Sequence, residues 1–333
     1  MRKIASKIAV LSLLFSAAST HAVLIGPGPG TQNITAPINF PSWNNVGKVS
    51  LGGGVYLGNR WVISAVHLDP MTNNSITFPG IGGPYALENT PGTYHIITNA
   101  NGTPTDMVLM HMTVDPGLPT LNIPTSSPVL GTPVTMTGFG SVRGAAVQYD
   151  GSYNEVASGG VYSGYKFNPN VAGPKRWGTS NTSTFDGVHT VLIAALPSST
   201  TNTAVFTAEF RKSSNGGTAD EALAVNGDSG GAVFSTSSPN TLLGIMLYQD
   251  ALTIPGGQPY DPASNLGTAL YGDGTDAGNL ATYAPQILSV TGIPEPTTLG
   301  LISVAGTLLI RRRKRAFSDA GNIERPVESP KYH

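Results

Sequence analysis

The sequence predicts an all-β protein built from two consecutive antiparallel barrels or sandwiches. Turn-forming residues are abundant, with 41 Gly and 26 Pro among 333 residues, and they separate short apolar runs. Charged residues make up only 11% of the chain, which argues against disorder driven by charge repulsion. The apolar runs form two successive groups, and their spacing is typical of short strands in barrels or sandwiches.

The predicted strands are bounded by clusters of Gly, Pro or Asn. The first group comprises residues 53–58, 61–65, 75–78, 93–98, 106–112 and 133–140. The second group comprises residues 189–196, 203–210, 231–234 and 241–249. Residues 279–290 are predicted to form a closing helix. Residues 141–188, rich in Gly, Ser, Asn and Tyr, are interpreted as a long insertion between the two groups.

The first 22 residues have the order of a secretory signal peptide. Three basic residues precede an apolar run at 8–17, and small residues follow up to Ala22. The run is too short for an ordinary membrane span. We therefore expect signal peptidase to cut near Ala22, leaving a Pro/Gly/Asn-rich extended leader over 23–47 and a folded domain over 48–293.

The C-terminal region carries a second targeting signature. A Pro-Glu-Pro triplet at 294–296 leads a short apolar stretch, and five consecutive basic residues follow at Arg311–Arg315. This order resembles the PEP-CTERM sorting signal of Gram-negative bacteria, which exosortase-type enzymes are thought to recognise and remove. The resemblance implies a sorting segment over 294–315, transiently anchored in the inner membrane, ahead of an unusually long polar tail over 316–333. A plain C-terminal anchor is the alternative.

Both interpretations of the C-terminal region place the domain outside the cytoplasm, at the cell surface or in the extracellular matrix. Membrane contact is then expected only through that segment.

Charge and cysteine content exclude several functions. The chain has 18 basic and 19 acidic residues; the signal segment contributes three bases, and the residues after 293 contribute seven bases and four acids. That leaves 8 basic and 15 acidic residues over 23–293, a net charge of −7, with no basic patch for nucleic acid. The absence of cysteine excludes disulfides, thiol catalysis and cysteine metal sites.

The stretch AVNGDSGGAVF at 224–234 places Ser229 in a glycine-rich turn ahead of an apolar run. A serine nucleophile needs a base, an orienting carboxylate and donors for an oxyanion. His67 follows a predicted strand that ends in small residues, and Asp106 opens another apolar strand. Taken singly, a structural histidine and a turn-forming aspartate are the more common interpretations of such residues. Their order and surroundings in this chain favour a catalytic set.

Together these segments resemble the trypsin/chymotrypsin-like serine peptidases. WVISAVH at 61–67, DMVLM at 106–110 and GDSGG at 227–231 follow the family's motifs in the family's order. TGFG at 137–140 and LLGIMLY at 242–248 match two further segments. The resemblance covers roughly residues 50–290, although 141–188 is covered only by continuity.

The resemblance implies a fold of two six-stranded antiparallel β-barrels with a short C-terminal helix. It implies that Ser229 is the nucleophile, His67 the general base and then acid, and Asp106 the group that orients His67. The backbone N–H groups of Gly227 and Ser229 would form the oxyanion hole. Glycine suits position 227 because the backbone must turn tightly there. No cofactor or metal is expected, and the substrate would be a protein or peptide.

Asp228 departs from the family in its expected partner. In the family this aspartate pairs with an amine freed by zymogen cleavage, but the usual Ile-Val-Gly-Gly sequence is absent here. The stretches VLIGPG at 23–28 and NVGKVS at 45–50 are poor substitutes. We therefore expect activity without zymogen cleavage of the usual kind. The possible partners of this structural carboxylate are Arg60, Arg211, Lys212 and backbone amides.

The predicted substrate pocket also departs from the family pattern. Leu223 stands where trypsin has an aspartate, so no carboxylate is available there to bind Lys or Arg. Gln249 replaces a pocket glycine, and together with Tyr248 this favours a narrow pocket for small or medium apolar side chains. Leu247 replaces a serine that usually contacts the catalytic aspartate, which predicts weaker support for Asp106.

Two other functions stay open from the sequence. The first is a binding module that keeps the fold but is catalytically weak or inactive, because fold does not fix function. An esterase using the same triad is the other. The remaining histidines of the predicted domain lack metal-ligand spacing and are interpreted as structural. These are His95, His111 and His189.

Overall fold

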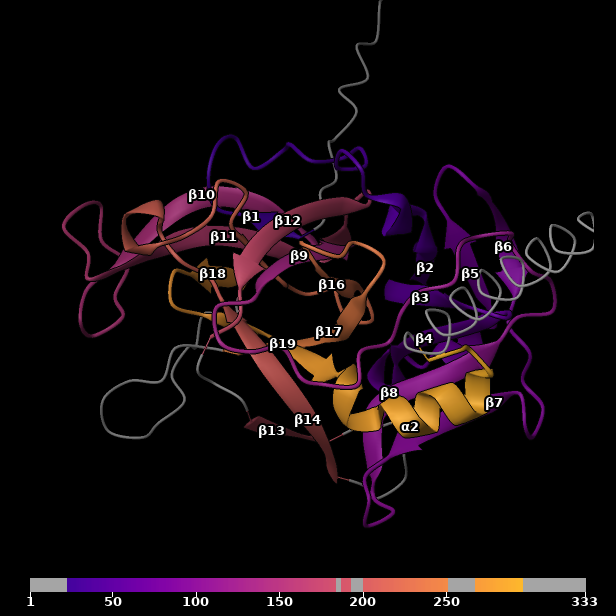
Figure 1. Ribbon diagram of the computed structural model, residues 1–333. Helices are drawn as coiled ribbons and strands as arrows, with labels where there is room; N and C mark the ends of the chain where they lie inside the picture. The colour runs from indigo at the N-terminus through magenta and orange to yellow at the C-terminus, as the bar shows by residue number, and fades with distance from the viewer. Residues whose placement is uncertain (1–22, 184–186, 193–199, 251–266, 296–333) are drawn as a thin grey trace, which may run out of the picture.

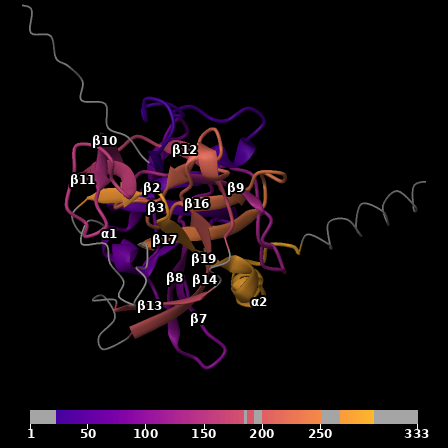
Figure 2. The ribbon, with the colours of Figure 1, turned by 90° about the vertical axis from the view of Figure 1, so that its left-hand side faces the viewer.

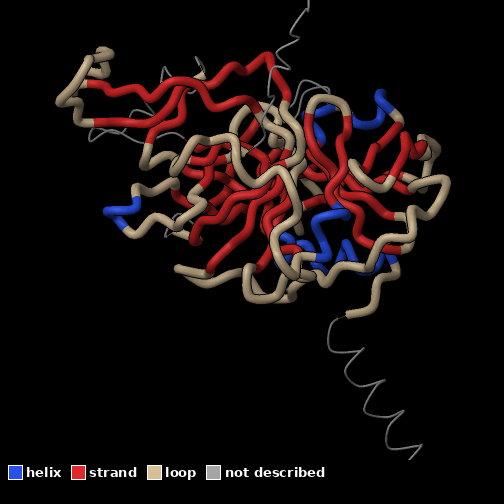
Figure 3. The backbone as a smooth tube through the Cα atoms, turned by 90° about the horizontal axis from the view of Figure 1, so that it is seen from above, coloured by secondary structure: helices blue, strands red, loops and turns tan. Residues whose placement is uncertain are grey.

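A computed structural model describes residues 23–183, 187–192, 200–250 and 267–295 of the chain. These residues are mostly in antiparallel β-strands, arranged in two large sheets with one short C-terminal helix. The predicted all-β class, with two consecutive β-units and a closing helix, is therefore confirmed. Seen from above, the strands gather into two groups (Figure 3).

The first sheet, called the N-terminal sheet below, has seven strands in the order β6-β5-β2-β3-β4-β8-β7. Three predicted strands coincide with β3 (Gly52–Gly58), β4 (Trp61–Ala65) and β5 (Ser75–Phe78) to within one residue. The other strands are β2 (Val46–Val49), β6 (Gly82–Ala86), β7 (Tyr94–Thr98) and β8 (Pro104–His111).

The second sheet, called the C-terminal sheet below, also has seven strands, in the order β12-β9-β16-β17-β19-β14-β13. They are β9 (Pro133–Gly138), β12 (Arg176–Asn181), β13 (Gly187–Leu192), β14 (Thr200–Glu209), β16 (Ala232–Ser235), β17 (Leu242–Asp250) and β19 (Gly274–Asn279). The expectation of six strands in each barrel is thus off by one strand per sheet. Within the described residues, the edge strands of neither sheet pair with each other to close a barrel.

The region that the sequence left unassigned forms a hairpin and a sheet strand. β10 (Ser141–Tyr149) pairs with β11 (Tyr162–Ala172), and β11 pairs in turn with β18 (Thr268–Leu270). The chain then enters β12 of the C-terminal sheet. In Figure 1 the hairpin extends away from the two large sheets at the left.

The hairpin holds the beginning of the described chain. Short strand β1 (Leu24–Ile25) pairs with β15 (Ala222–Leu223), next to the hairpin. Arg143 on β10 donates to the carbonyl oxygens of Ile25 and Gly26, both at 2.6 Å, and its other terminal nitrogen donates to Gly28 O at 2.9 Å. The guanidinium also lies 3.9 Å from the ring centroid of Tyr165. The predicted leader is therefore fastened to the fold over its first residues.

Helices are few and short. Within the described residues they are η1 (Pro41–Asn45), η2 (Val66–Leu68), α1 (Pro70–Asn73), η3 (Ser213–Asn215) and α2 (Leu280–Thr291). The buried positions Leu280, Tyr283, Ala284 and Ile287 of α2 follow the spacing of one helical face. That face packs against β17 and β7, so α2 contacts both sheets from the outside (Figure 2).

One hydrophobic cluster joins the two large sheets. It contains Ile63 and Leu109 from the N-terminal sheet and Phe234 and Ile245 from the C-terminal sheet, all fully buried. The chain has no cysteine, so no disulfide joins the halves, and hydrophobic packing in this shared core holds them together. His67 from the N-terminal half and Ser229 from the C-terminal half line one pocket.

The predicted export segments lie outside most of this description. The signal segment 1–22 and nearly all of the sorting segment and tail, 296–333, fall outside the described residues. Within the described part of the chain, none of the helices has the length and apolar character needed to cross a membrane.

Candidate active site

Strand pairing brings His67 and Asp106 together. β4 and β8 are antiparallel neighbours, and Ala65 lies opposite Met107. His67 follows β4 in the turn η2, while Asp106 is on β8 immediately before Met107. His67 Nδ1 lies 2.6 Å from Asp106 Oδ2, and the His67 backbone N–H donates to Asp106 Oδ1 at 3.0 Å.

The environment of Asp106 fixes the protonation pattern of the pair. The Asp106 side chain is fully buried, whereas that of His67 is 26% exposed. A buried carboxylate is costly unless it is hydrogen-bonded, so Asp106 requires the donors that surround it. A hydrogen on His67 Nδ1 satisfies this requirement and leaves Nε2 as the basic nitrogen.

Asp106 also connects the two sheets. Its backbone N–H donates to Thr203 Oγ1 of β14 at 2.9 Å. The Tyr248 hydroxyl of β17 donates a very short hydrogen bond to Asp106 Oδ2. The prediction that Leu247 weakens the support of Asp106 left out this tyrosine, which supplies a hydroxyl from the next residue along the strand.

Ser229 lies in the turn between β15 and β16, which is bounded by unusual glycines. Gly227 and Gly230 have φ of +92° and +76°, a region that other residues rarely adopt. A Cβ on Gly230 would stand only 2.1 Å from Gly53 O. The Gly53 N–H in turn donates to Ser229 O at 2.7 Å, so the turn is fastened to β3 of the N-terminal sheet.

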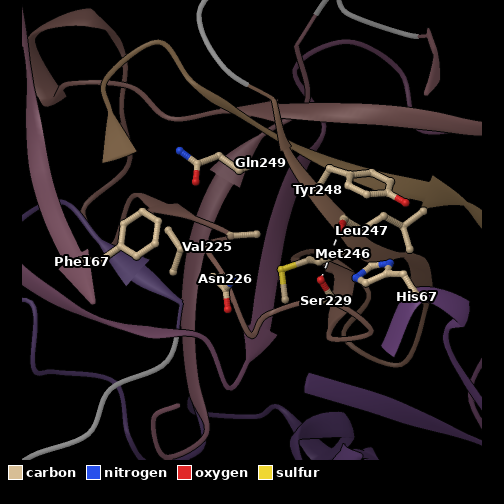
Figure 4. A pocket seen from close by; sticks show the side chains of 10 residues that line it. His67, Phe167, Val225, Asn226, Ser229, Met246, Leu247, Tyr248 and Gln249 are labelled. Carbon is tan, nitrogen blue, oxygen red and sulfur yellow. Dashed lines mark hydrogen bonds between the residues drawn. The ribbon is translucent and has the colours of Figure 1, made fainter. Parts of the chain in front are cut away.

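The Ser229 hydroxyl occupies a resting orientation. Its Oγ donates to Leu247 O at 3.4 Å, and within the described residues no hydrogen bond joins it to His67. Both side chains nevertheless line the same pocket and lie at the same end of it (Figure 4). Catalytic hydrogen bonds are often long or unformed in the absence of substrate, so this orientation does not exclude Ser229 as a candidate nucleophile.

The predicted oxyanion donors are unoccupied. In the described part of the molecule, the N–H groups of Gly227 and Ser229 have no hydrogen-bond acceptor. The neighbouring amides of the turn are used instead: Asp228 N–H donates to Val225 O at 2.9 Å, and Gly231 N–H to Asp228 O at 2.8 Å. The turn thus leaves two amides available beside the Ser229 hydroxyl.

Asp228 is fully buried beneath this turn, and backbone amides are its hydrogen-bond partners. Oδ1 accepts from Gly140 N–H at 2.7 Å and from Val23 N–H at 3.2 Å, while Oδ2 accepts from Val225 N–H at 3.0 Å. Burial raises the pKa of this carboxyl from 3.8 to about 6, although these donors and the charge of Arg176 oppose the rise. Of the partners considered from the sequence, the backbone amides are the ones found.

The three basic residues considered from the sequence make other contacts. Arg60 donates to Thr113 O at 3.2 Å, and Arg211 pairs with Glu209 at 2.9 Å. Lys212 lies 5.7 Å from the ring centroid of Tyr271.

Val23 is the unexpected partner of Asp228. It is fully buried and has a φ of +36°, which is strained for a β-branched residue. Its position follows from the β1–β15 pairing and from the bond of 2.8 Å between Gly26 N–H and Glu221 O. Sequence reasoning missed the contact because VLIGPG lacks the glycine-rich pattern sought there.

A pocket of about 270 Å³ adjoins Ser229 and His67. Of the residues predicted to line it, Leu247, Tyr248 and Gln249 do so, while Leu223 is fully buried in an adjacent hydrophobic cluster and does not line it. The lining residues that the sequence did not suggest are Phe167, Ala224, Val225, Asn226 and Met246.

Phe167 and Gln249 lie at the opposite end of the pocket from His67 (Figure 4). Gln249 Nε2 donates to Asp273 Oδ2 at 2.9 Å and to Thr268 O at 3.1 Å, which holds its side chain in place. Phe167 comes from β11, in the region that the sequence left unassigned. No motif in the sequence indicates that this strand contributes to the pocket.

The other histidines make ordinary structural contacts. His111 Nδ1 lies 3.0 Å from Glu88 Oε1, and the rings of His95 and His111 pack against Trp61. The side chain of His189 lies outside the described residues. Among the residues that the structure describes, there is no group of three or more His, Asp or Glu side chains suited to a metal ion.

Comparison with known proteins gives structural similarity only. No family model and no curated protein matches the sequence. A mutant of human heparin binding protein covers 79% of this chain and 97% of its own, with 12% identity and a TM-score of 0.45.

Two proteases are similar to about the same degree. The active form of the Rv3671c protease from M. tuberculosis covers 83% of this chain and 93% of its own, with 13% identity and a TM-score of 0.43. Mouse neuropsin, a serine protease, covers 77% and 97%, with 13% identity and a TM-score of 0.42. With all TM-scores below 0.5, these similarities carry no argument about activity.

Proposed function

We propose that this protein is a serine endopeptidase of the trypsin/chymotrypsin-like family, acting on proteins or peptides. The observation that supports it most is that Ser229 and His67 line one pocket while His67 pairs with Asp106. Within the described residues, the N–H groups of Gly227 and Ser229 in the same turn have no acceptor. The two sheets contribute different members of this set, so its assembly depends on the complete fold.

The reaction follows from the positions of these groups. Ser229 Oγ attacks the carbonyl carbon of the substrate while His67 Nε2 takes its proton. The Gly227 and Ser229 N–H groups stabilise the negative oxygen of the tetrahedral intermediate. Collapse breaks the carbon–nitrogen bond, and His67 returns the proton to the leaving amine. Water, activated by His67, then hydrolyses the acyl-enzyme and regenerates Ser229.

The pocket supports a preference for apolar side chains before the cleaved bond. Its far end is formed by Phe167, Val225 and the immobilised Gln249, and none of the described residues that line it carries a carboxylate. A peptide-library profile tests this, and dominance of Lys or Arg before the cut would contradict it.

Export is the second part of the proposal. The signal segment and the C-terminal resemblance to sorting signals support processing by signal peptidase and an exosortase-type enzyme. The protein would act at the cell surface or in the extracellular matrix.

We further propose that export itself completes the site. Cutting after Ala22 would make Val23 the first residue, convert its amide into an ammonium group next to Asp228, and abolish the strained φ. No additional zymogen cut would be needed. A cut at Lys48 is disfavoured because Lys48 pairs with Gly53 and Thr77 inside the sheet.

Chain forms that start at Val23, or that carry one extra glycine before it, test this activation step. We expect the longer form to react roughly 100-fold more slowly with an active-site probe, the cost of a misplaced oxyanion donor. Equal rates would refute it. Mass spectrometry of active protein purified from its host identifies the natural first residue.

The first experiment for the catalytic proposal is labelling of the purified protein with a fluorophosphonate. The label should map to Ser229 and disappear in Ser229→Ala and His67→Ala.

Folded protein that is not labelled, even when it begins at Val23, would instead support a binding module. The bond between Ser229 Oγ and Leu247 O is the observation that keeps this second function open. Parallel peptide and ester assays separate a peptidase from an esterase.

A further inference from the structure

The Asp106 carboxylate accepts hydrogen bonds from two separate sources. One is His67, which uses its backbone N–H toward Oδ1 and its ring Nδ1 toward Oδ2. The other is the Tyr248 hydroxyl, which donates to Oδ2, the same oxygen that His67 Nδ1 contacts. Because this oxygen is shared, any change in the Tyr248 bond acts directly on the bond between Asp106 and the imidazole.

A local irregularity of β17 brings Tyr248 to this position. In the β17–β19 ladder, Met246 lies opposite Ala277 and Tyr248 lies opposite Asp276, with a register shift between the two pairs. The shift accommodates Leu247, which is 2% exposed and packs into the core shared by the sheets. Such a bulge re-aims side chains, and here the hydroxyl comes from the residue that follows the apolar one.

The surroundings of Tyr248 keep its hydroxyl a donor. Burial, followed by the negative charge of Asp106, raises the pKa of this phenol, and Asp276 of β19 adds to the rise. The phenol therefore stays protonated at neutral pH and well above it. The Tyr248 ring also lies 5.6 Å from the His67 ring, at an interplanar angle of 31°, so it covers one side of the imidazole.

We propose that Tyr248 is a positioning residue for catalysis, whose hydroxyl holds Asp106 and limits how strongly that carboxylate attracts the protonated His67. The inference rests on the proposed function and deepens it. Sharing Oδ2 fixes the direction of the carboxylate while withdrawing part of its charge from the imidazole. The base is thereby oriented, and it still releases its proton to the leaving group.

Tyr248→Phe tests the proposal, because it removes one oxygen and keeps the ring. We expect the second-order rate constant for fluorophosphonate labelling to fall about 10- to 100-fold, the scale of losing a hydrogen bond to a charged group. Without the phenol, Asp106 attracts the imidazolium more strongly. The acid limb of the rate–pH profile should therefore move to higher pH.

Tyr56→Phe is the matched control. Tyr56 is also a buried tyrosine that donates to a carboxylate, with a distance of 2.8 Å from its hydroxyl to Asp115 Oδ1, but it lies outside the pocket. Burial raises its pKa to about 12. This substitution should leave both the labelling rate and the pH profile unchanged.

A measurement independent of activity separates the two proposals. The titration of His67 followed by NMR should move to higher pH in Tyr248→Phe even if the wild-type protein is never labelled. Replacement of Tyr248 by difluorotyrosine, a stronger donor of nearly the same shape, should move it the opposite way. An unmoved titration in both variants overturns the positioning role. Absence of labelling in the wild-type protein, with the titration shifted, overturns only the catalytic one.

Discussion

In the N-terminal sheet, His67 and Asp106 are placed by strand pairing, whereas in the C-terminal sheet Ser229 is placed by a turn. The first arrangement follows from the β4–β8 ladder, which runs without a register shift from Trp61 opposite His111 to Ala65 opposite Met107. The second depends on glycines with positive φ, on the buried Asp228 and on a strand with a register shift. His67 and Asp106 are thus held together by a regular strand ladder, whereas Ser229 is held by a turn that departs from regular structure.

The largest expected effect comes from breaking the contribution of the N-terminal sheet. Asp106→Asn keeps the shape of the side chain but no longer favours a proton on His67 Nδ1. We expect the rate of fluorophosphonate labelling to fall about 10⁴-fold. Thermal unfolding checks that the variant is folded. A decrease below 10-fold would show that Asp106 does not orient the base.

Breaking the turn of the C-terminal sheet should reduce stability. Gly230→Ala places a Cβ 2.1 Å from Gly53 O at a φ of +76°. We expect a loss of about 3 kcal/mol in the free energy of unfolding, measured by urea denaturation. The control is Gly151→Ala, where a Cβ meets no atom within 4 Å and stability should be nearly unchanged. Equal stability of the two variants would contradict the role assigned to this contact.

The burial of Asp228 should make the stability of the C-terminal half depend on pH. Its raised pKa means that the folded chain binds this proton more tightly than the unfolded chain between pH 3.8 and about 6. In a chain that still carries residues before Val23, the free energy of unfolding should therefore fall, by up to about 3 kcal/mol, as the pH rises through that interval.

Urea unfolding at several pH values measures this dependence. The raised pKa of buried Glu221 contributes in the same direction, so Asp228→Asn should remove only part of the slope. In protein that begins at Val23, the new ammonium group should flatten the Asp228 contribution. A slope unaffected by Asp228→Asn would assign the dependence to other groups.

The smallest expected effect concerns specificity. Phe167→Ala should widen the pocket, and the preference for larger over smaller apolar side chains should shift roughly 10-fold in a peptide library. Phe78→Ala removes a buried ring from the N-terminal sheet and should reduce stability without changing the preference. A shift of the same size in both variants would show that stability, and not pocket shape, is being measured.

The same contrast explains what the sequence could predict. Strands such as 61–65 and 75–78 were predictable because short apolar runs lie between clear turn residues, and local pattern suffices there. His67, Asp106 and Ser229 stood out through motifs that lie on or beside such strands. The β10–β11 hairpin was not predictable, since its β10 burial pattern is irregular and its pairing contains register shifts.

The contacts of the site were harder to predict than its members. The bond from Tyr248 to Asp106 joins residues 142 positions apart, and the bond from Val23 to Asp228 joins residues 205 positions apart. Neither a tyrosine nor a valine indicates by its type that it contacts a buried aspartate. The departure at Leu247 is visible in the sequence, but its consequence depends on the bulge that turns the neighbouring Tyr248 toward Asp106.

The clamp that Arg143 forms on the leader touches main-chain oxygens only. Every amino acid offers the same carbonyl, so these contacts do not depend on the leader side chains, although burial constrains Val23, Leu24 and Ile25. Gly26 and Gly30 are exceptions, because a Cβ at either would collide with ring or guanidinium atoms. Relatives of this protein should therefore be sought by an arginine at the start of the hairpin and by two small residues at positions 26 and 30, preceded by a buried apolar run.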